Sequence, residues 1–279
     1  MMWPSRPASV PKTALVTLVA FVGCFFLGLA LCTPLMLEGG YAAVCLALAV
    51  NSIACFALPG IVARVFAVGR ARAFSGGSVD GNVLVMAFLT AFLCQPFVQW
   101  ATYVDSLISS ALGFPADFAA ASNALLIQVC DFSDVWHWAV ALIVVALLPA
   151  VSEELFFRGA LLPLLRRVAG NWHVAVGLTA VIFSAVHMDP SGFLSRAVLG
   201  AILGALFVIT RSLWAPMLFH FTNNALAVVS ISLASSPAEA FNQPVEEPDA
   251  LFTCVSVAFT IFELYFIEQA VRRQKEQKF

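Results

Sequence analysis

The sequence contains little charge. Only 11% of its 279 residues are Asp, Glu, Lys or Arg, whereas 61% are hydrophobic. A soluble protein of this length needs far more polar surface to enclose its core, so the composition excludes a soluble domain and predicts a chain embedded in membrane lipids. The formal net charge of -2 by itself says nothing about nucleic acid, but no long basic or acidic run occurs, and we expect no nucleic-acid partner.

The sequence also lacks the spacings of several common sites. Its seven cysteines are an odd number, include no C-x-x-C pair and lie mostly in apolar runs. We interpret them as small apolar side chains that fill space between helices, in preference to disulfides or zinc ligands. H-E-x-x-H and G-x-S-x-G are absent, which excludes the usual signatures of zinc peptidases and serine hydrolases.

Apolar runs that end at charges, glycines or prolines make up most of the chain. Runs of membrane-spanning length lie near residues 13–37, 41–68, 82–112, 136–165, 172–188, 192–210, 213–235 and 250–271. They predict an all-α fold, a polytopic membrane helix bundle with about eight transmembrane helices that forms a single membrane domain over residues 1–279. The longest polar stretches, 113–135 and 236–249, are expected to be extracytoplasmic loops.

Eight spans would sort the charged residues by side. One side would receive the basic N-terminus, Arg64, Arg70, Arg72, Arg166, Arg167, Arg211, Arg272, Arg273 and Lys275. The other would receive Glu38, Asp105, Asp117, Asp131, Asp134, Asp189, Glu239, Glu246, Glu247 and Asp249. Because Lys and Arg are enriched in cytoplasmic loops, we expect both termini in the cytoplasm, and the expected location is a bacterial plasma membrane.

One apolar run carries ionisable residues where hydrocarbon is expected. Within residues 136–165, the stretch P-A-V-S-E-E-L-F-F-R contains Glu153, Glu154 and Arg158. Each charge at membrane depth costs on the order of 3 kcal/mol, so such residues usually mark a functional site. Helical spacing puts Glu154 and Arg158 on one face, where they can pair, and leaves Glu153 free for chemistry. A purely structural ion pair that orients the helix would give the same pattern.

Two further polar clusters lie in apolar runs, F-S-A-V-H at residues 183–187 and H-F-T-N-N at residues 220–224. The directions of the predicted helices allow His187 and His220 to converge with Glu153. These three residues could hold a divalent metal such as zinc, whose bound water attacks a carbonyl. Alternatively, Glu153 is a general base, and His220 and Asn224 donate hydrogen bonds to an oxyanion. A lone histidine could instead serve only a bond between helices.

The three clusters together resemble the EExxxR, FxxxH and HxxxN motifs of the CAAX prenyl endoprotease and bacteriocin-processing family of intramembrane proteases, called CPBP or ABI. The resemblance covers about residues 143–230, and we expect the catalytic core over residues 136–235. It implies an intramembrane endopeptidase that acts on a prenylated or membrane-associated peptide or protein. The implied catalytic residues are Glu153, which activates water, its orienting pair Glu154 and Arg158, the assisting His187, and the oxyanion donors His220 and Asn224. Family members have also been called metalloproteases.

Other classes of function fit the same composition. A non-catalytic membrane scaffold, or a bacteriocin-immunity protein, could retain this fold without cleaving anything. A small transporter is disfavoured because paired broken helices and internal repeats are missing from the sequence.

Overall fold

The computed structural model describes residues 9–68, 79–114, 117–242 and 245–276. Arg70, Arg72 and residues 1–8, on which the predicted charge sorting partly depends, lie outside the described residues. Within the described ranges the chain is helical and contains no strand. The prediction of an all-α fold is confirmed.

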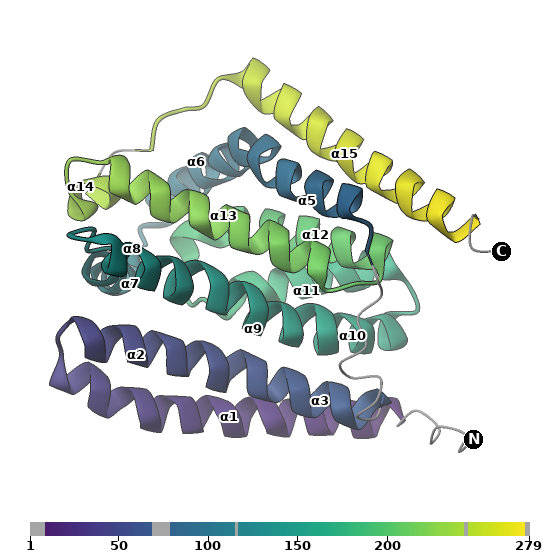
Figure 1. Cartoon of the computed structure of the whole chain (residues 1–279), viewed down its shortest axis with the longest axis horizontal. Helices are drawn as coiled ribbons and strands as arrows, with labels where there is room; N and C mark the ends of the chain where they lie inside the picture. Colours follow the sequence, from purple (N-terminus) through teal and green to yellow (C-terminus); the bar gives the residue numbers. More distant parts are fainter. Residues whose placement is uncertain (1–8, 69–78, 115–116, 243–244, 277–279) are drawn as a thin grey trace.

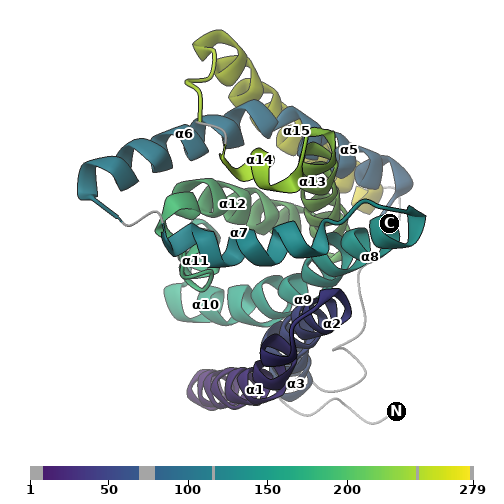
Figure 2. The ribbon, with the colours of Figure 1, turned by 90° about the vertical axis from the view of Figure 1, so that its left-hand side faces the viewer.

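Most of the helices lie roughly side by side along the long axis of the molecule (Figure 1), whereas α7 (Asp117–Val129) runs across it (Figure 2). Their bounds are α1 (Val10–Glu38), α2 (Tyr41–Ser52), α3 (Leu58–Val68), α5 (Gly81–Leu93), α6 (Gln95–Leu112), α7 (Asp117–Val129), α8 (Val135–Ala141), α9 (Leu148–Phe156), α10 (Leu162–Ala169), α11 (Trp172–Ala185), α12 (Phe193–Thr210), α13 (Trp214–Leu233), α14 (Pro237–Asn242) and α15 (Ala250–Glu276). A short 3₁₀ turn, η4 (Pro190–Gly192), precedes α12. Figure 2 shows the bundle along its length, with α9 and α10 between the α1–α3 layer and α11 to α13.

Three π-helical segments lie within two long helices, Tyr41–Ala67 and Val135–Ala169, and each stands directly before a Leu-Pro pair. The segments are η1 (Ile53–Ala57), η2 (Leu142–Leu147) and η3 (Phe157–Leu161), and each is followed by leucine and proline. Proline has no N–H for the carbonyl four residues earlier, and its ring clashes with that carbonyl, so the preceding turn widens. Because π-helical turns are frequent at functional sites, η2 and η3 on either side of α9 single out that helix.

Fewer helices than eight meet the length and hydropathy expected of a membrane span. Five do so, Val10–Glu38, Tyr41–Ala67, Val135–Ala169, Pro190–Thr210 and Ala250–Gln274. A sixth is added if α5 and α6, bent by 41° at their junction, are one span. The polytopic membrane bundle is confirmed, but in the described part of the chain the count is five or six. The difference arises because α11 has only 14 residues and α13 contains the polar H-F-T-N-N motif.

The predicted loops also contain helices. Residues 113–135 include α7, whose sequence A-A-A-S-N-A-L-L-I-Q-V is rich in helix-forming alanine and leucine. Residues 236–249 include the short helix α14. The polar character of residues 113–135 comes mainly from the two ends of that stretch, so its average composition concealed the apolar helix α7.

Most of the basic residues at helix ends gather at one end of the bundle. The start of α1 and the ends of α3, α10, α12 and α15 all lie on the right in Figure 1. Lys12, Arg64, Arg166, Arg211 and Arg272 occupy these helix ends. We call this the basic end. The loop between α1 and α2, which follows Glu38, lies at the opposite end.

Small residues let the helices around α9 approach closely. A Cβ atom on Gly60 of α3 would lie 2.8 Å from the backbone of Leu155, and one on Gly200 of α12 would lie 3.0 Å from the Cα atom of Ala180. Any side chain at Gly60 would therefore push α3 away from the helix that carries the two glutamates. The same tight contact of α12 with α11 brings the carbonyl of Gly200 beside Arg158.

Candidate active site

Glu154 and Arg158 form a fully buried ion pair, as their spacing predicted. Arg158 Nη1 donates to Glu154 Oε1 at 2.7 Å, and both side chains have 0% exposure. Arg158 Nη2 donates to the carbonyl oxygen of Gly200 at 2.9 Å, and the guanidinium lies 4.9 Å from the ring centroid of Phe183. The pair thus ties α9 to α11 and α12, and each charge is compensated inside the protein.

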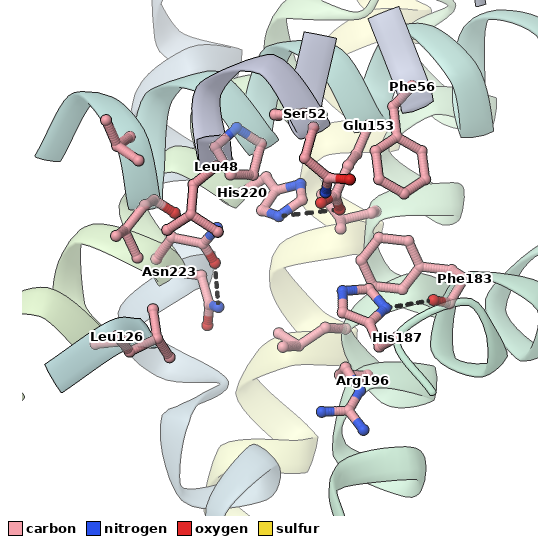
Figure 3. Close-up of a pocket in the computed structure, with 18 of the residues that line it drawn as sticks. Leu48, Ser52, Phe56, Leu126, Glu153, Phe183, His187, Arg196, His220 and Asn223 are labelled. Atoms are coloured by element: carbon pink, nitrogen blue, oxygen red, sulfur yellow. Dashed lines mark hydrogen bonds and ion pairs between the residues drawn. The ribbon is translucent and has the colours of Figure 1, made fainter. Parts of the chain in front are cut away.

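Glu153 points to a different side of α9 and lines a cavity of about 420 Å³. His187, His220 and Asn224 line the same cavity, whereas Glu154 and Arg158 do not. Figure 3 shows Glu153 beside His220, with His187 on another part of the wall. The four residues predicted to carry the chemistry are therefore brought to one cavity, and the ion pair lies behind them.

His220 connects the two glutamates. Its Nδ1 atom lies 2.9 Å from Glu154 Oε1, and its Nε2 atom lies 3.9 Å from Glu153 Oε2. An ionised carboxylate can only accept, so the proton on Nδ1 is donated to Glu154, and Nε2 is left facing Glu153 and the cavity. The sequence motifs did not predict this bond, because they place His220 with Asn224 and assign Glu154 to Arg158 alone.

His187 is held by its own helix end. Its Nδ1 atom lies 2.7 Å from the carbonyl oxygen of Phe183. A carbonyl only accepts, so Nδ1 carries the proton and the neutral ring presents the Nε2 lone pair. The ring of Phe183 lies 5.1 Å from that of His187 and 6.0 Å from that of His220, measured between centroids. Phe183 therefore fixes the tautomer of one histidine and packs against both.

Asn224 is positioned by the widened helix that precedes α9. Its Nδ2 atom donates to the carbonyl oxygen of Val145 at 3.2 Å. In a regular helix that carbonyl would accept from residue 149, but Pro149 has no N–H. Asn224 thus supplies the Val145 carbonyl with a donor in place of the N–H that Pro149 lacks. The same bond turns the amide of Asn224 toward η2, which forms part of the cavity wall.

The region that carries these residues matches a known family. Residues 135–226 match the family model described as Rce1-like, the type II CAAX prenyl endopeptidases. This segment is Rce1-like. The resemblance indicated by the three motifs is confirmed over these residues, and the match suggests a protease of the membrane. No curated protein and no solved structure shows a significant match to the chain.

Two polar residues beside the Rce1-like motifs were missed by sequence reasoning. Asn223 Nδ2 donates to Asn224 Oδ1 at 3.3 Å, and Gln95 Nε2 donates to Asn223 Oδ1 at 3.1 Å. Gln95 stands at the junction of α5 and α6, where Ser256 of α15 accepts from the backbone N–H of Phe97 at 3.2 Å and donates to the carbonyl oxygen of Leu93. The only signal in the sequence was a Gln-Pro pair inside an apolar run.

The donor set of the Rce1-like cavity does not fit a metal site. Among the described residues, no group of three or more His, Cys, Asp or Glu side chains is placed to hold a metal ion. His187 forms no hydrogen bond or ion pair with Glu153 or His220 in the part of the chain that the structure describes. The prediction that Glu153, His187 and His220 share one ion therefore stays a prediction without a matching geometry among the described residues.

Replacing Gln95 with methionine should slow cleavage without unfolding the protein. Methionine has a similar length but cannot donate to Asn223, so Asn223 and Asn224 lose a support that holds the amide in place. Methionine also removes the bond from Gln95 Nε2 to the carbonyl oxygen of Ala91, but only the bond to Asn223 leads to the cavity. Loss of that bond should lower kcat about fivefold, the equivalent of ~1 kcal/mol, with KM unchanged. The measurement is steady-state cleavage of a fluorogenic peptide.

Gln99→Met is the matched control, because Gln99 lies on the same helix, is exposed and does not line the cavity. Gln95→Glu retains the length and polarity of the side chain but loses the amide donor, and should resemble Gln95→Met. Equal kcat in all variants and the wild type would show that the chain from Gln95 to Asn224 has no part in positioning.

Proposed function

We propose that this protein is an intramembrane endopeptidase of the CAAX prenyl protease type, in which Glu153 activates water. The observation that supports this most is the shared cavity. Glu153, His187, His220 and Asn224 line it, while the charge of Arg158 is compensated by Glu154 behind its wall. A carboxylate that faces polar side chains of the cavity, and that forms no ion pair with an arginine among the described residues, suits a general base.

In the proposed reaction a water molecule in the cavity gives a proton to the Glu153 carboxylate as its oxygen attacks the scissile carbonyl. A C–O bond forms, and the electron pair of the carbonyl moves to its oxygen. That oxyanion accepts from the second N–H of Asn224 Nδ2 and from Nε2 of His220 when this ring is protonated. The C–N bond then breaks, and protonated Glu153 returns its proton to the leaving amine.

Glu154 has two roles in this scheme. Its Oε1 atom accepts from both Arg158 and His220. A carboxylate on Nδ1 holds the imidazole in the orientation that turns Nε2 toward the cavity, as in other carboxylate–histidine pairs. Glu154 is therefore proposed as a positioning residue that acts through His220, whereas Glu153 acts on the reacting atoms.

His187 is proposed to hold the attacking water. With its Nδ1 proton on the carbonyl of Phe183, its Nε2 lone pair can accept from a water molecule in the cavity. The rest of the wall is mostly apolar and includes Leu48, Leu126, Leu199 and Leu203. Such a wall favours a peptide carried in the membrane, either prenylated or otherwise membrane-associated, over a polar soluble one.

Cleavage of a peptide library by the purified protein tests this proposal. Prenylated and unprenylated peptides are incubated with the wild type and with Glu153→Ala in detergent, and the products are identified by mass spectrometry. We expect cleavage by the wild type alone. Because the described residues assemble no group of three metal-ligating side chains, we expect cleavage to survive a chelator. If neither protein cleaves any peptide while both bind a partner protein, the molecule is a scaffold.

We also propose that the basic end faces the cytoplasm, so that both termini lie there and residues 236–249 lie outside. The reason is the enrichment of Lys and Arg at that end of the bundle. A reporter that is active only in the cytoplasm should give a signal when it is fused to the C-terminus and no signal when it is fused within residues 236–249. The same signal from both positions would contradict this topology.

A further inference from the structure

A second cavity lies at the basic end of the bundle, away from the active site. It has a volume of about 550 Å³ and lies between α11, α12 and α15. Its polar lining is Trp172, His173, Arg211, Glu268 and Arg272, and its apolar lining is Val176, Ala205, Val208, Ile209 and Val271. His173 and His187 stand near opposite ends of α11, roughly 20 Å apart at ~1.5 Å of rise per residue. The two cavities are therefore separate sites.

Two arginines lie over the ring of Trp172. The Cζ atom of Arg211 is 4.3 Å from the ring centroid, and that of Arg166 is 5.5 Å from it. Contact with an indole face stabilises a guanidinium and fixes its plane. In the described ranges of the chain neither arginine forms an ion pair with a carboxylate, and Nε of Arg166 is buried without a hydrogen-bond partner.

The only carboxylate that lines this cavity in the described chain is already paired. Glu268 Oε1 lies 2.6 Å from Arg272 Nη2 and so neutralises that arginine. Partial burial, and then the charge of Arg166, lower the pKa of Arg211. The two guanidinium groups at Trp172 thus repel each other, and an anion bound between or beside them would relieve that repulsion.

The backbone at Arg211 gives independent support. Arg211 has φ of 57°, in the left-handed region, where it ends α12 and donates its N–H to the carbonyl oxygen of Phe207 at 2.8 Å. Glycine is the residue that usually occupies this position, because a side chain there is strained. An arginine held in that conformation suggests that its side chain is needed for a purpose other than ending the helix.

We propose that this cavity binds the phosphate group of an anionic phospholipid. The planar guanidinium matches two phosphate oxygens at once, and a tryptophan at a helix end is typical of headgroup depth. Free phosphate has the same charge chemistry, but the apolar lining from Val176 to Val271 suits the first carbons of an acyl chain. Basic pockets between membrane helices are known to accept anionic headgroups in this way.

Lipid binding to the full chain in detergent tests the proposal. The purified protein is titrated with phosphatidylglycerol, with phosphatidylcholine and with inorganic phosphate, and binding is followed by thermal unfolding and by retained lipid in native mass spectrometry. We expect phosphatidylglycerol alone to bind and raise the unfolding temperature. Arg211→Gly should weaken that binding at least about tenfold, since a charge-assisted contact is lost.

Arg211→Gly is chosen because glycine fits the left-handed backbone, so the lipid-free protein should unfold at the same temperature as the wild type or higher. Arg273→Gln is the matched control, because Arg273 is exposed at the same end and does not line the cavity. Wild-type affinity in Arg211→Gly, or equal weakening in Arg273→Gln, would overturn the site. Inorganic phosphate that binds as tightly as phosphatidylglycerol would overturn the lipid as its ligand.

Discussion

Replacing Glu153 with glutamine should abolish peptide cleavage and leave thermal unfolding in detergent nearly unchanged. Glutamine has almost the same shape, but its amide cannot accept a proton from water. Loss of a general base lowers kcat on the order of 10²–10⁴-fold. Stability should be retained because, among the described residues, the contact of the Glu153 carboxylate is with His220 Nε2 at 3.9 Å, which is longer than a hydrogen bond.

The control for this variant is Glu263→Gln, a glutamate within α15 that does not line the cavity. It should cleave peptides at the wild-type rate. If Glu153→Gln unfolds the protein and Glu154→Gln leaves both stability and cleavage intact, the assignments of the two glutamates are wrong.

Replacing Glu154 with alanine should have the largest effect on stability. The change leaves Arg158, with 0% exposure, as an uncompensated charge inside the bundle. Breaking a buried pair in this way costs ~3 kcal/mol or more, so the unfolding temperature should fall strongly. The variant should also lose activity, because His220 loses the acceptor for its Nδ1 proton.

A double variant separates these two effects. Glu154→Leu with Arg158→Met removes both charges and should recover most of the stability, since apolar side chains carry no desolvation cost. Cleavage should not recover, because the acceptor of His220 is still absent. Recovery of both stability and cleavage would show that Glu154 serves only as the partner of Arg158.

The features that sequence reasoning placed well depend on local spacing. The pair of Glu154 and Arg158 is four residues apart on one helix, so helical geometry alone predicts it. The same geometry places Glu153 on a different face of the helix from this pair. The motif at residues 220–224 likewise indicated that His220 and Asn224 belong to one site, and both line the cavity.

The features that it missed depend on contacts between distant segments. His220 and Glu154 are 66 residues apart, and Gln95 and Asn223 are 128 apart, so no local pattern encodes either bond. The bond of Asn224 to Val145 also requires the widened helical turn before Pro149, and the hydropathy of the sequence does not reveal such a turn. The number of candidate spans in the described chain differs from eight for a related reason, because the polar residues of α13 line the cavity and lower the hydropathy of that helix.

Cleavage in ¹⁸O-labelled water tests most directly whether Glu153 acts as a base on water. The wild type is allowed many turnovers of a substrate peptide in labelled water. The masses of the product and of the enzyme fragment that contains Glu153 are then measured by mass spectrometry. We predict one ¹⁸O atom in the new carboxyl group of each product and none in Glu153. Label in the carboxyl group of Glu153, absent when substrate is omitted, would show that it bonds to the substrate and would contradict the account.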